Sequence, residues 1–167
     1  MPALRPGLLY FAYGCNMDPG FLAGVVGVTL EPGWPACLDG WRLVFNKVGE
    51  GEAGWDVVAT IEEDAACCVL GVVYRLPQST LSALDEFEGV PTHYQRATVW
   101  LEPLGRRARQ AALVYRAQPR WIVDDGTLSP RYLELLIRGA RQHGLAEEYI
   151  SWLQRWARGE IEECYKI

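Results

Sequence analysis

Residues 81–90 carry a carboxylate whose position suits proton transfer. Thr80 favours the start of a helix and Gly89 favours the position just after a helix end, so a short helix is predicted between them. At about 100° per residue, Glu88 falls on the apolar face of that helix. The other members of this face are Leu81, Leu84 and Phe87. A carboxylate on an apolar face costs free energy unless the protein uses it, so Glu88 is the leading candidate for a general base.

Three effects are expected to raise the pKa of Glu88 toward neutrality. Burial disfavours the charged form, the C-terminal end of a helix is its negative pole, and Asp85 and Glu86 add like charges. Asp85 and Glu86 are themselves expected to be solvated, with Glu86 roughly opposite the apolar face. The alternative interpretation of Glu88 is a last-turn residue that points into water, as residues at short helix ends often do.

The composition is typical of one globular domain over residues 1–167. Half of the residues are hydrophobic and 11% are aromatic, and the chain is long enough for a substantial core. The net charge of −5 disfavours binding to nucleic acid or to an anionic membrane. No apolar run approaches the roughly 20 residues of a membrane span. The first seven residues lack the apolar core of a secretory signal, so a cytoplasmic protein is expected.

The cysteines and histidines follow no disulfide or metal-binding pattern. The cysteine count of five is odd, no Cys-x-x-Cys pair occurs, and the neighbours Cys67 and Cys68 would point to opposite faces of a strand. We interpret the cysteines as small buried residues of a cytoplasmic protein. His93 and His143 have no partners at metal-ligand spacing, so no metal site is expected.

Apolar runs predict six strands, which precede two C-terminal helices. The strands are expected at residues 8–13, 41–46, 56–61, 67–76, 94–102 and 109–116. Gly71 is a predicted bulge or bend, and prolines and glycines predict an irregular connection over residues 29–40. One helix is predicted from Ser129-Pro130 to Gly144, and another over residues 149–156. The expected fold class is α+β, a small, mainly antiparallel or mixed β-barrel with flanking helices.

The first strand turns at Gly14 into a short helix that Asp18 and Pro19 open. Backbone N–H groups at such a turn can hold a carboxylate, a phosphate or a developing oxyanion. Gly14 permits close approach of a ligand, and Asn16 and Asp18 can tie the turn together through side-chain hydrogen bonds. The pattern is also typical of a tight strand-to-helix turn that binds nothing, and it matches neither glycine-rich nucleotide motif.

Two segments together resemble the AIG2-like γ-glutamylcyclotransferase family. They are Tyr-Phe-Ala-Tyr-Gly-Cys-Asn-Met at residues 10–17 and Leu-Asp-Glu-Phe-Glu-Gly-Val at residues 84–90. The resemblance implies that Glu88 is the proton acceptor and that Tyr132, in a Ser-Pro-Arg-Tyr stretch, lies in the substrate pocket. It also implies that a loop holds the γ-glutamyl group, formed by Tyr10, Phe11, Ala12, Tyr13, Gly14, Cys15 and Asn16. Cys15 stands where the family has a serine, and a thiol is a weaker hydrogen-bond donor than a hydroxyl.

The resemblance implies an enzyme that cyclises a small γ-glutamyl substrate to 5-oxoproline and releases an amine or an amino acid. The α-amino group of the substrate attacks its own γ-carbonyl, so the reaction needs no metal or other cofactor. The leaving group stays open between an amino acid, an amine and a γ-glutamyl-protected intermediate, with the loops 49–55 and 116–128 expected to line its pocket.

Two different functions are also compatible with these residues. A thiol amidohydrolase would use Cys15 as its nucleophile, since a cysteine near a helix N-terminus can have a depressed pKa, but such an enzyme also needs a positioned base. A binding module would keep the fold and the pocket without turnover. The exposed charges permit a monomer or a homodimer.

Overall fold

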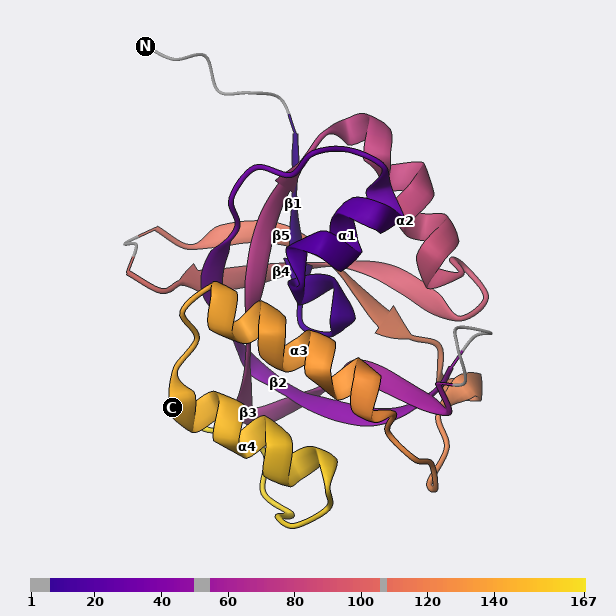
Figure 1. Cartoon of the computed structure of the whole chain (residues 1–167), viewed down its shortest axis with the longest axis vertical. Helices are drawn as coiled ribbons and strands as arrows, with labels where there is room; N and C mark the ends of the chain where they lie inside the picture. Colours follow the sequence, from indigo (N-terminus) through magenta and orange to yellow (C-terminus); the bar gives the residue numbers. More distant parts are fainter. Residues whose placement is uncertain (1–6, 50–54, 106–107) are drawn as a thin grey trace.

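The computed structural model describes residues 7–49, 55–105 and 108–167, and a closed β-barrel forms its centre (Figure 1). Within these residues the barrel has five strands, β1 (Leu8–Ala12), β2 (Trp34–Val48), β3 (Val57–Leu76), β4 (Tyr94–Pro103) and β5 (Gln110–Ala117). Their order around the barrel is β1-β3-β2-β4-β5. The pair of β1 and β5 is parallel, and the other neighbours are antiparallel. The predicted α+β class with a small mixed barrel is confirmed.

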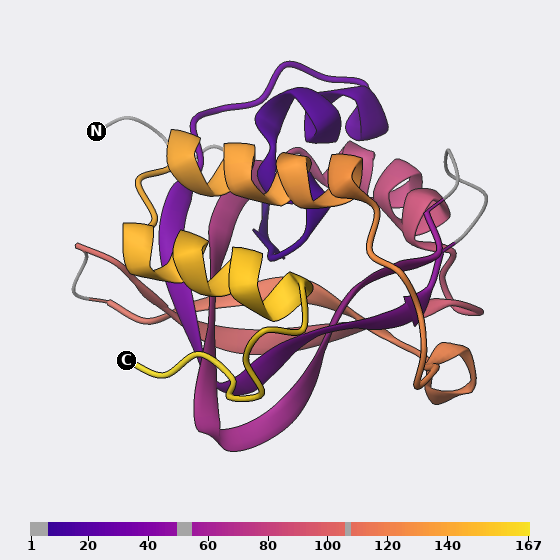
Figure 2. The same cartoon turned by 60° about the horizontal axis from the view of Figure 1, so that its bottom comes forward.

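Helices cover one side of this barrel. They are α1 (Pro19–Val26), α2 (Leu81–Glu88), α3 (Pro130–Gln142) and α4 (Glu147–Ala157), with short 3₁₀ helices η1 (Cys15–Met17), η2 (Gln78–Thr80) and η3 (Pro119–Trp121). Figures 1 and 2 show α3 and α4 side by side, with α1 along the opposite side of α3. The first turn of α3 and the end of α2 are thereby brought to the turn that follows β1.

The long strands β2 and β3 differ from the sequence prediction. The expected break near residues 62–66 does not occur, because Glu62 and Glu63 continue the pairing with β2, and Arg42 forms an ion pair with Glu62. The prediction of an irregular connection over residues 29–40 is wrong from residue 34 onward, where β2 begins. β2 accommodates Gly40 beside a register shift, in a left-handed backbone conformation with φ +83°. Two predicted strands are therefore one, and the barrel has five strands instead of six.

Of the two predictions for Gly71, a bulge or a bend, the bulge is wrong. The pairing of β3 with β2 runs through Gly71 without a shift and places it opposite Ala36. A Cβ atom on Gly71 would lie 2.4 Å from the Ala12 carbonyl oxygen and 2.6 Å from the Phe11 ring. Glycine is needed here because β1 approaches β3 closely, just before β1 enters the turn at Gly14.

The helix limits follow the predicted signals. Asp18 caps α1 by accepting a hydrogen bond from the Phe21 N–H at 2.8 Å. α2 ends at Gly89, which is left-handed with φ +67°, and Gly144 follows the end of α3 with φ +70°. Among the helices of the described residues, none has the length and hydropathy that a bilayer crossing requires.

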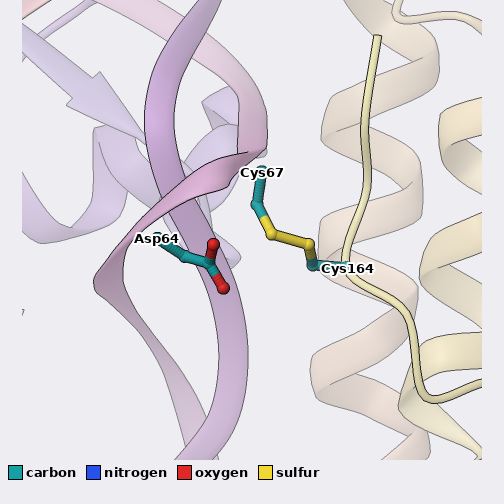
Figure 3. Close-up of side chains that lie close together, drawn as sticks. All are labelled: Asp64, Cys67 and Cys164. Carbon is teal, nitrogen blue, oxygen red and sulfur yellow. A yellow bond between two sulfur atoms is a disulfide. The ribbon is translucent and has the colours of Figure 1, made fainter.

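The cysteine prediction is wrong for two of the five residues. A disulfide joins Cys67 on β3 to Cys164 near the C-terminus, across 97 residues, and Figure 3 shows Asp64 beside it. The carboxylate of Asp64 and the two sulfur atoms lie within 4.8 Å of one another, but no thiolate of this pair is left to bind a metal ion. The other three, Cys15, Cys37 and Cys68, are buried free thiols as predicted.

Candidate active site

A cavity of about 280 Å³ lies between the turn after β1, the C-terminal end of α2 and the start of β3. Five of the chain's eight tyrosines line it, together with the charged residues Lys47, Glu86 and Glu88. The full lining is Tyr10, Tyr13, Gly14, Cys15, Asn16, Lys47, Trp55, Val58, Ala59, Glu86, Phe87, Glu88, Tyr94, Tyr115 and Tyr132. Pockets for small molecules start at about 300 Å³, so this cavity suits a compact ligand.

Glu88 is the last residue of α2 and lines the cavity, half-buried. The left-handed backbone of Gly89 ends the helix directly after it. Glu88 therefore does not point away into bulk water, which was the alternative for a last-turn residue. Glu86 also reaches the rim of the cavity, although it is exposed and was expected roughly opposite the apolar face.

Asn16 connects the turn after β1 to Glu88. Its side chain is 3% exposed, and its Nδ2 lies 3.0 Å from the hydroxyl oxygen of Tyr10 and 3.4 Å from Oε1 of Glu88. We expected Asn16 to tie the turn itself together, but two backbone bonds do this instead. The Met17 N–H donates to the Gly14 carbonyl at 3.0 Å, and the Asp18 N–H donates to the Cys15 carbonyl at 3.1 Å. An anion at this turn must therefore use the N–H groups that precede Met17.

Tyr132 enters the cavity from the first turn of α3 and is buried. Its hydroxyl oxygen accepts a hydrogen bond from the Ala59 N–H at 3.0 Å, and its ring meets the Trp55 ring edge to face at 4.9 Å. A Cβ atom on Gly14 would lie 2.8 Å from this hydroxyl. Gly14 was predicted to permit the close approach of a ligand. In the structure the group that approaches it closely is the Tyr132 hydroxyl. Only the family resemblance pointed to Tyr132, because nothing in the local pattern separates it from an ordinary early-helix residue.

The tyrosines of the cavity are neutral hydrogen-bonding groups. Burial raises the pKa of Tyr10 and Tyr13 well above the usual value, and the negative charge of Glu88 raises it further. Tyr13 donates its hydroxyl proton to the Tyr115 carbonyl at 2.5 Å, and Tyr94 donates to the Ala59 carbonyl at 2.7 Å. The tyrosine rings form rigid walls of the cavity. The charge of the cavity comes from its acidic and basic side chains.

Asp85 is not solvated as expected but holds α2 on the barrel. Arg96 on β4 donates two hydrogen bonds to its carboxylate, one from Nε at 2.9 Å, and the Tyr115 hydroxyl on β5 donates a third at 2.6 Å. The Arg96 hydrogen bond is the main cause that lowers the pKa of Asp85, and burial opposes it. These contacts fix the helix whose last residue is Glu88.

The lowered pKa of Asp85 predicts a specific dependence of stability on pH. A carboxyl with a depressed native pKa contributes its full stability above the unfolded value, here 3.8, and loses it as the pH falls through the native pKa. Asp85→Asn should therefore cost about 1 kcal/mol at pH 7, since Arg96 is partly exposed, and progressively less at an acidic pH below 3.8, as the native pKa is approached. Urea unfolding at both pH values measures the difference, with the exposed Asp125→Asn as control. An equal cost at both pH values would contradict the role of this ion pair.

Lys47 is a functional candidate that the sequence did not reveal. It is 1% exposed and lines the cavity, with Nζ 3.0 Å from Nδ1 of His93 and 5.0 Å from the centre of the Tyr94 ring. The predicted strand ends at Asn46, which places Lys47 in the polar loop that follows. The signal was present, because continuing the strand by one residue places a charged side chain in the barrel wall.

Seven of the nine site residues expected from the resemblance line the cavity. They are Tyr10, Tyr13, Gly14, Cys15, Asn16, Glu88 and Tyr132. Phe11 and Ala12 are outside the lining and buried in β1, where both pack against Gly71. Both residues belong to the barrel wall, and their assignment to substrate binding stays a prediction. Residues 50–54 of the loop expected near the leaving group lie outside the described residues, whereas its end, Trp55, lines the cavity.

The chain is similar to known proteins over most of its length. The model of the AIG2-like family matches residues 68–153 of the 167. A γ-glutamylcyclotransferase of Bos taurus is 30% identical over 145 residues, and one of Mus musculus is 29% identical over 146 residues. Each match covers 84% of this chain and 74% of the relative. A solved γ-glutamyl cyclotransferase structure superposes with a TM-score of 0.78 at 27% identity, over 89% of this chain and 87% of that one.

Proposed function

The chain belongs to the AIG2-like γ-glutamylcyclotransferase family, and we propose that it cyclises a γ-glutamyl substrate to 5-oxoproline in the cavity beside Glu88. The reaction is an intramolecular acyl transfer, in which the α-amino nitrogen bonds to the γ-carbonyl carbon and the bond to the leaving nitrogen breaks. The products are 5-oxoproline and a free amine or amino acid.

Glu88 acts as general base and then as general acid. The α-amino group is an ammonium near pH 7 and cannot attack until it loses a proton. The half-buried Glu88 accepts this proton and returns it to the leaving nitrogen. After attack the α-amino nitrogen gives up a second proton by the same route, so the two protons that it loses end on the amine, which departs as an ammonium. Asn16, with Nδ2 at 3.4 Å, positions the carboxylate toward the turn after β1.

The turn after β1 binds the other polar end of the γ-glutamyl group. N–H groups of Gly14 and Cys15 are suited to the substrate carboxylate or to the oxyanion of the tetrahedral intermediate. The buried rings of Tyr10, Tyr13 and Tyr132 surround the folded substrate and hold it in the shape that leads to attack.

One observation carries this proposal, namely that Glu88 and the turn at Gly14 line the same cavity although they are 74 positions apart in sequence. The test is a panel of γ-glutamyl amino acids, γ-glutamyl amines and γ-glutamyl-protected intermediates, with 5-oxoproline measured by chromatography. We expect 5-oxoproline from at least one class. Binding without any product would favour the non-catalytic module instead.

The alternative nucleophile, Cys15, is tested by Cys15→Ala. A thiol amidohydrolase would lose all activity, whereas the cyclase should keep most of its turnover because its proposed mechanism uses the N–H group of residue 15 and not the thiol. We expect kcat/KM to change by less than about tenfold, since a thiol is a weak hydrogen-bond donor. Complete loss of turnover in a folded variant would reverse the assignment.

We further propose that the chain acts as one domain in the cytoplasm, without nucleic acid, and as a monomer or a homodimer. The net charge of −5 supports the absence of nucleic acid, since it gives no basic surface for a phosphate backbone. The Cys67–Cys164 disulfide weighs against the cytoplasm, where thiols are mostly reduced. Light scattering distinguishes a monomer from a homodimer, and thiol titration of freshly isolated protein measures how much of the Cys67–Cys164 pair is oxidised in the cell.

A further inference from the structure

Lys47 gives the cavity a cation that the cyclisation itself does not need. The chain has two lysines; Lys166 is exposed near the C-terminus, and Lys47 is 1% exposed inside the barrel. Burying an ammonium costs free energy, and such a cost is commonly tolerated where the charge binds something. The steps assigned to Glu88 and to the turn at Gly14 leave Lys47 without a role.

Lys47 and the turn after β1 flank the same short piece of β3. Lys47 is paired with Val58 in the β2–β3 ladder, and it lies over the ring of Tyr94, whose hydroxyl donates to the Ala59 carbonyl. Gly14 approaches Ala59 as well, beside Tyr132, whose hydroxyl accepts from the Ala59 N–H. The cavity therefore has two separate sources of positive potential, the N–H groups of the turn and the Lys47 ammonium.

This charge pattern matches a substrate with one ammonium and two carboxylates. Glu88 suits the ammonium, and the turn suits the α-carboxylate of the glutamyl group or the oxyanion. A second carboxylate exists only when the leaving group is an amino acid, because a γ-glutamyl amine lacks it. An ammonium offers three N–H donors, so the contact of Lys47 with Nδ1 of His93 at 3.0 Å is compatible with a bond to this carboxylate.

We propose that Lys47 binds the carboxylate of the departing amino acid and thereby selects γ-glutamyl amino acids over γ-glutamyl amines. The inference rests on the proposed cyclase function. His93 positions the Lys47 side chain by accepting a hydrogen bond at Nδ1, and His93 is in turn stacked on Trp121, with ring centres 4.2 Å apart.

The test compares γ-glutamylalanine with γ-glutamylethylamine, which differ in this carboxylate alone. We expect the wild-type protein to favour γ-glutamylalanine in kcat/KM by about 10- to 100-fold, the range of one charge-assisted hydrogen bond. Lys47→Met should remove most of this preference by slowing γ-glutamylalanine while sparing γ-glutamylethylamine. Lys47→Arg, which keeps the charge, should restore part of the preference, and Lys166→Met serves as the matched control on the exposed tail.

Each other result overturns the inference. An equal loss with both substrates in Lys47→Met would mean that Lys47 supports the fold, Glu88 or the glutamyl carboxylate, and an unchanged ratio would mean that it contacts no leaving group. The wild-type ratio is informative even if Lys47→Met does not fold, because no preference for γ-glutamylalanine contradicts the proposal directly. Absence of 5-oxoproline from both substrates and from the whole panel would instead refute the cyclase function.

Discussion

Glu88→Gln is expected to lower the rate of 5-oxoproline formation by about 10³-fold, within the range lost when a general base is removed. The amide has nearly the shape of the carboxylate, so Asn16 and the end of α2 should keep their positions. It cannot accept a proton from the substrate ammonium, so the nucleophile stays protonated. Single-turnover kinetics with a γ-glutamyl amino acid measures the loss, and circular dichroism confirms that the variant is folded.

Glu86→Gln is the matched control for this experiment. Glu86 is two residues away in the same helix and reaches the rim of the cavity, but it is exposed to solvent. Water and salt screen an exposed carboxylate, so we expect a loss of less than about threefold. Similar losses in the two variants would show that the base lies elsewhere.

Gly14→Ala is expected to lower turnover by about 100-fold and stability by about 1–3 kcal/mol. The new Cβ atom would lie 2.8 Å from the Tyr132 hydroxyl, which must then move away from the Ala59 N–H. Two costs follow, because a buried N–H group loses its acceptor and the wall beside the substrate shifts. Urea unfolding and steady-state kinetics measure them separately.

A second substitution isolates the cause of this effect. In Tyr132→Phe the hydroxyl is absent, so adding Gly14→Ala should cost clearly less than it does in the wild-type background. Gly24→Ala on α1 is the control, because a Cβ atom there meets nothing within 4 Å and alanine favours a helix by about 1 kcal/mol. Additive losses in the double variant would contradict the contact between Gly14 and Tyr132.

Local sequence signals were sufficient for the parts of the site that sit on short elements. The helical period put Glu88 on the apolar face of residues 81–88, and Gly89 limited that helix, so the carboxylate could be placed without the fold. The turn after β1 could also be predicted from local signals. Asp18 and Pro19 mark the start of α1, and the strand before it ends at Gly14, so only a short turn fits between the two elements.

Local sequence signals did not predict the contacts that are made across the barrel. Asp85 looked solvated because its partners, Arg96 and Tyr115, belong to β4 and β5. Cys67 can form its disulfide with Cys164 only because the C-terminal segment returns to β3, 97 residues later in the sequence. The limits of the two long strands were also missed, because Glu62 and Glu63 continue β3 and Lys47 continues β2.

The arrangement of these contacts explains why a small barrel can carry out this chemistry with few polar groups. Asp85 anchors α2 to β4 and β5, and Asn16 reaches Glu88 from the turn, so the carboxylate is held between two fixed elements. Tyr132 supports the same turn from α3. The residues that create this order are distant from one another in sequence, and the closed barrel brings them together.

The isotopic content of the product tests the central claim most directly. The protein is incubated with γ-glutamylalanine in water enriched in oxygen-18, and the products are identified by mass spectrometry. Cyclisation uses the substrate's own amine, so we predict unlabelled 5-oxoproline and alanine in equal amounts. Glutamate that carries the heavy oxygen would mean that water or a thiol, and not the α-amino group, attacks the γ-carbonyl, and it would contradict the account.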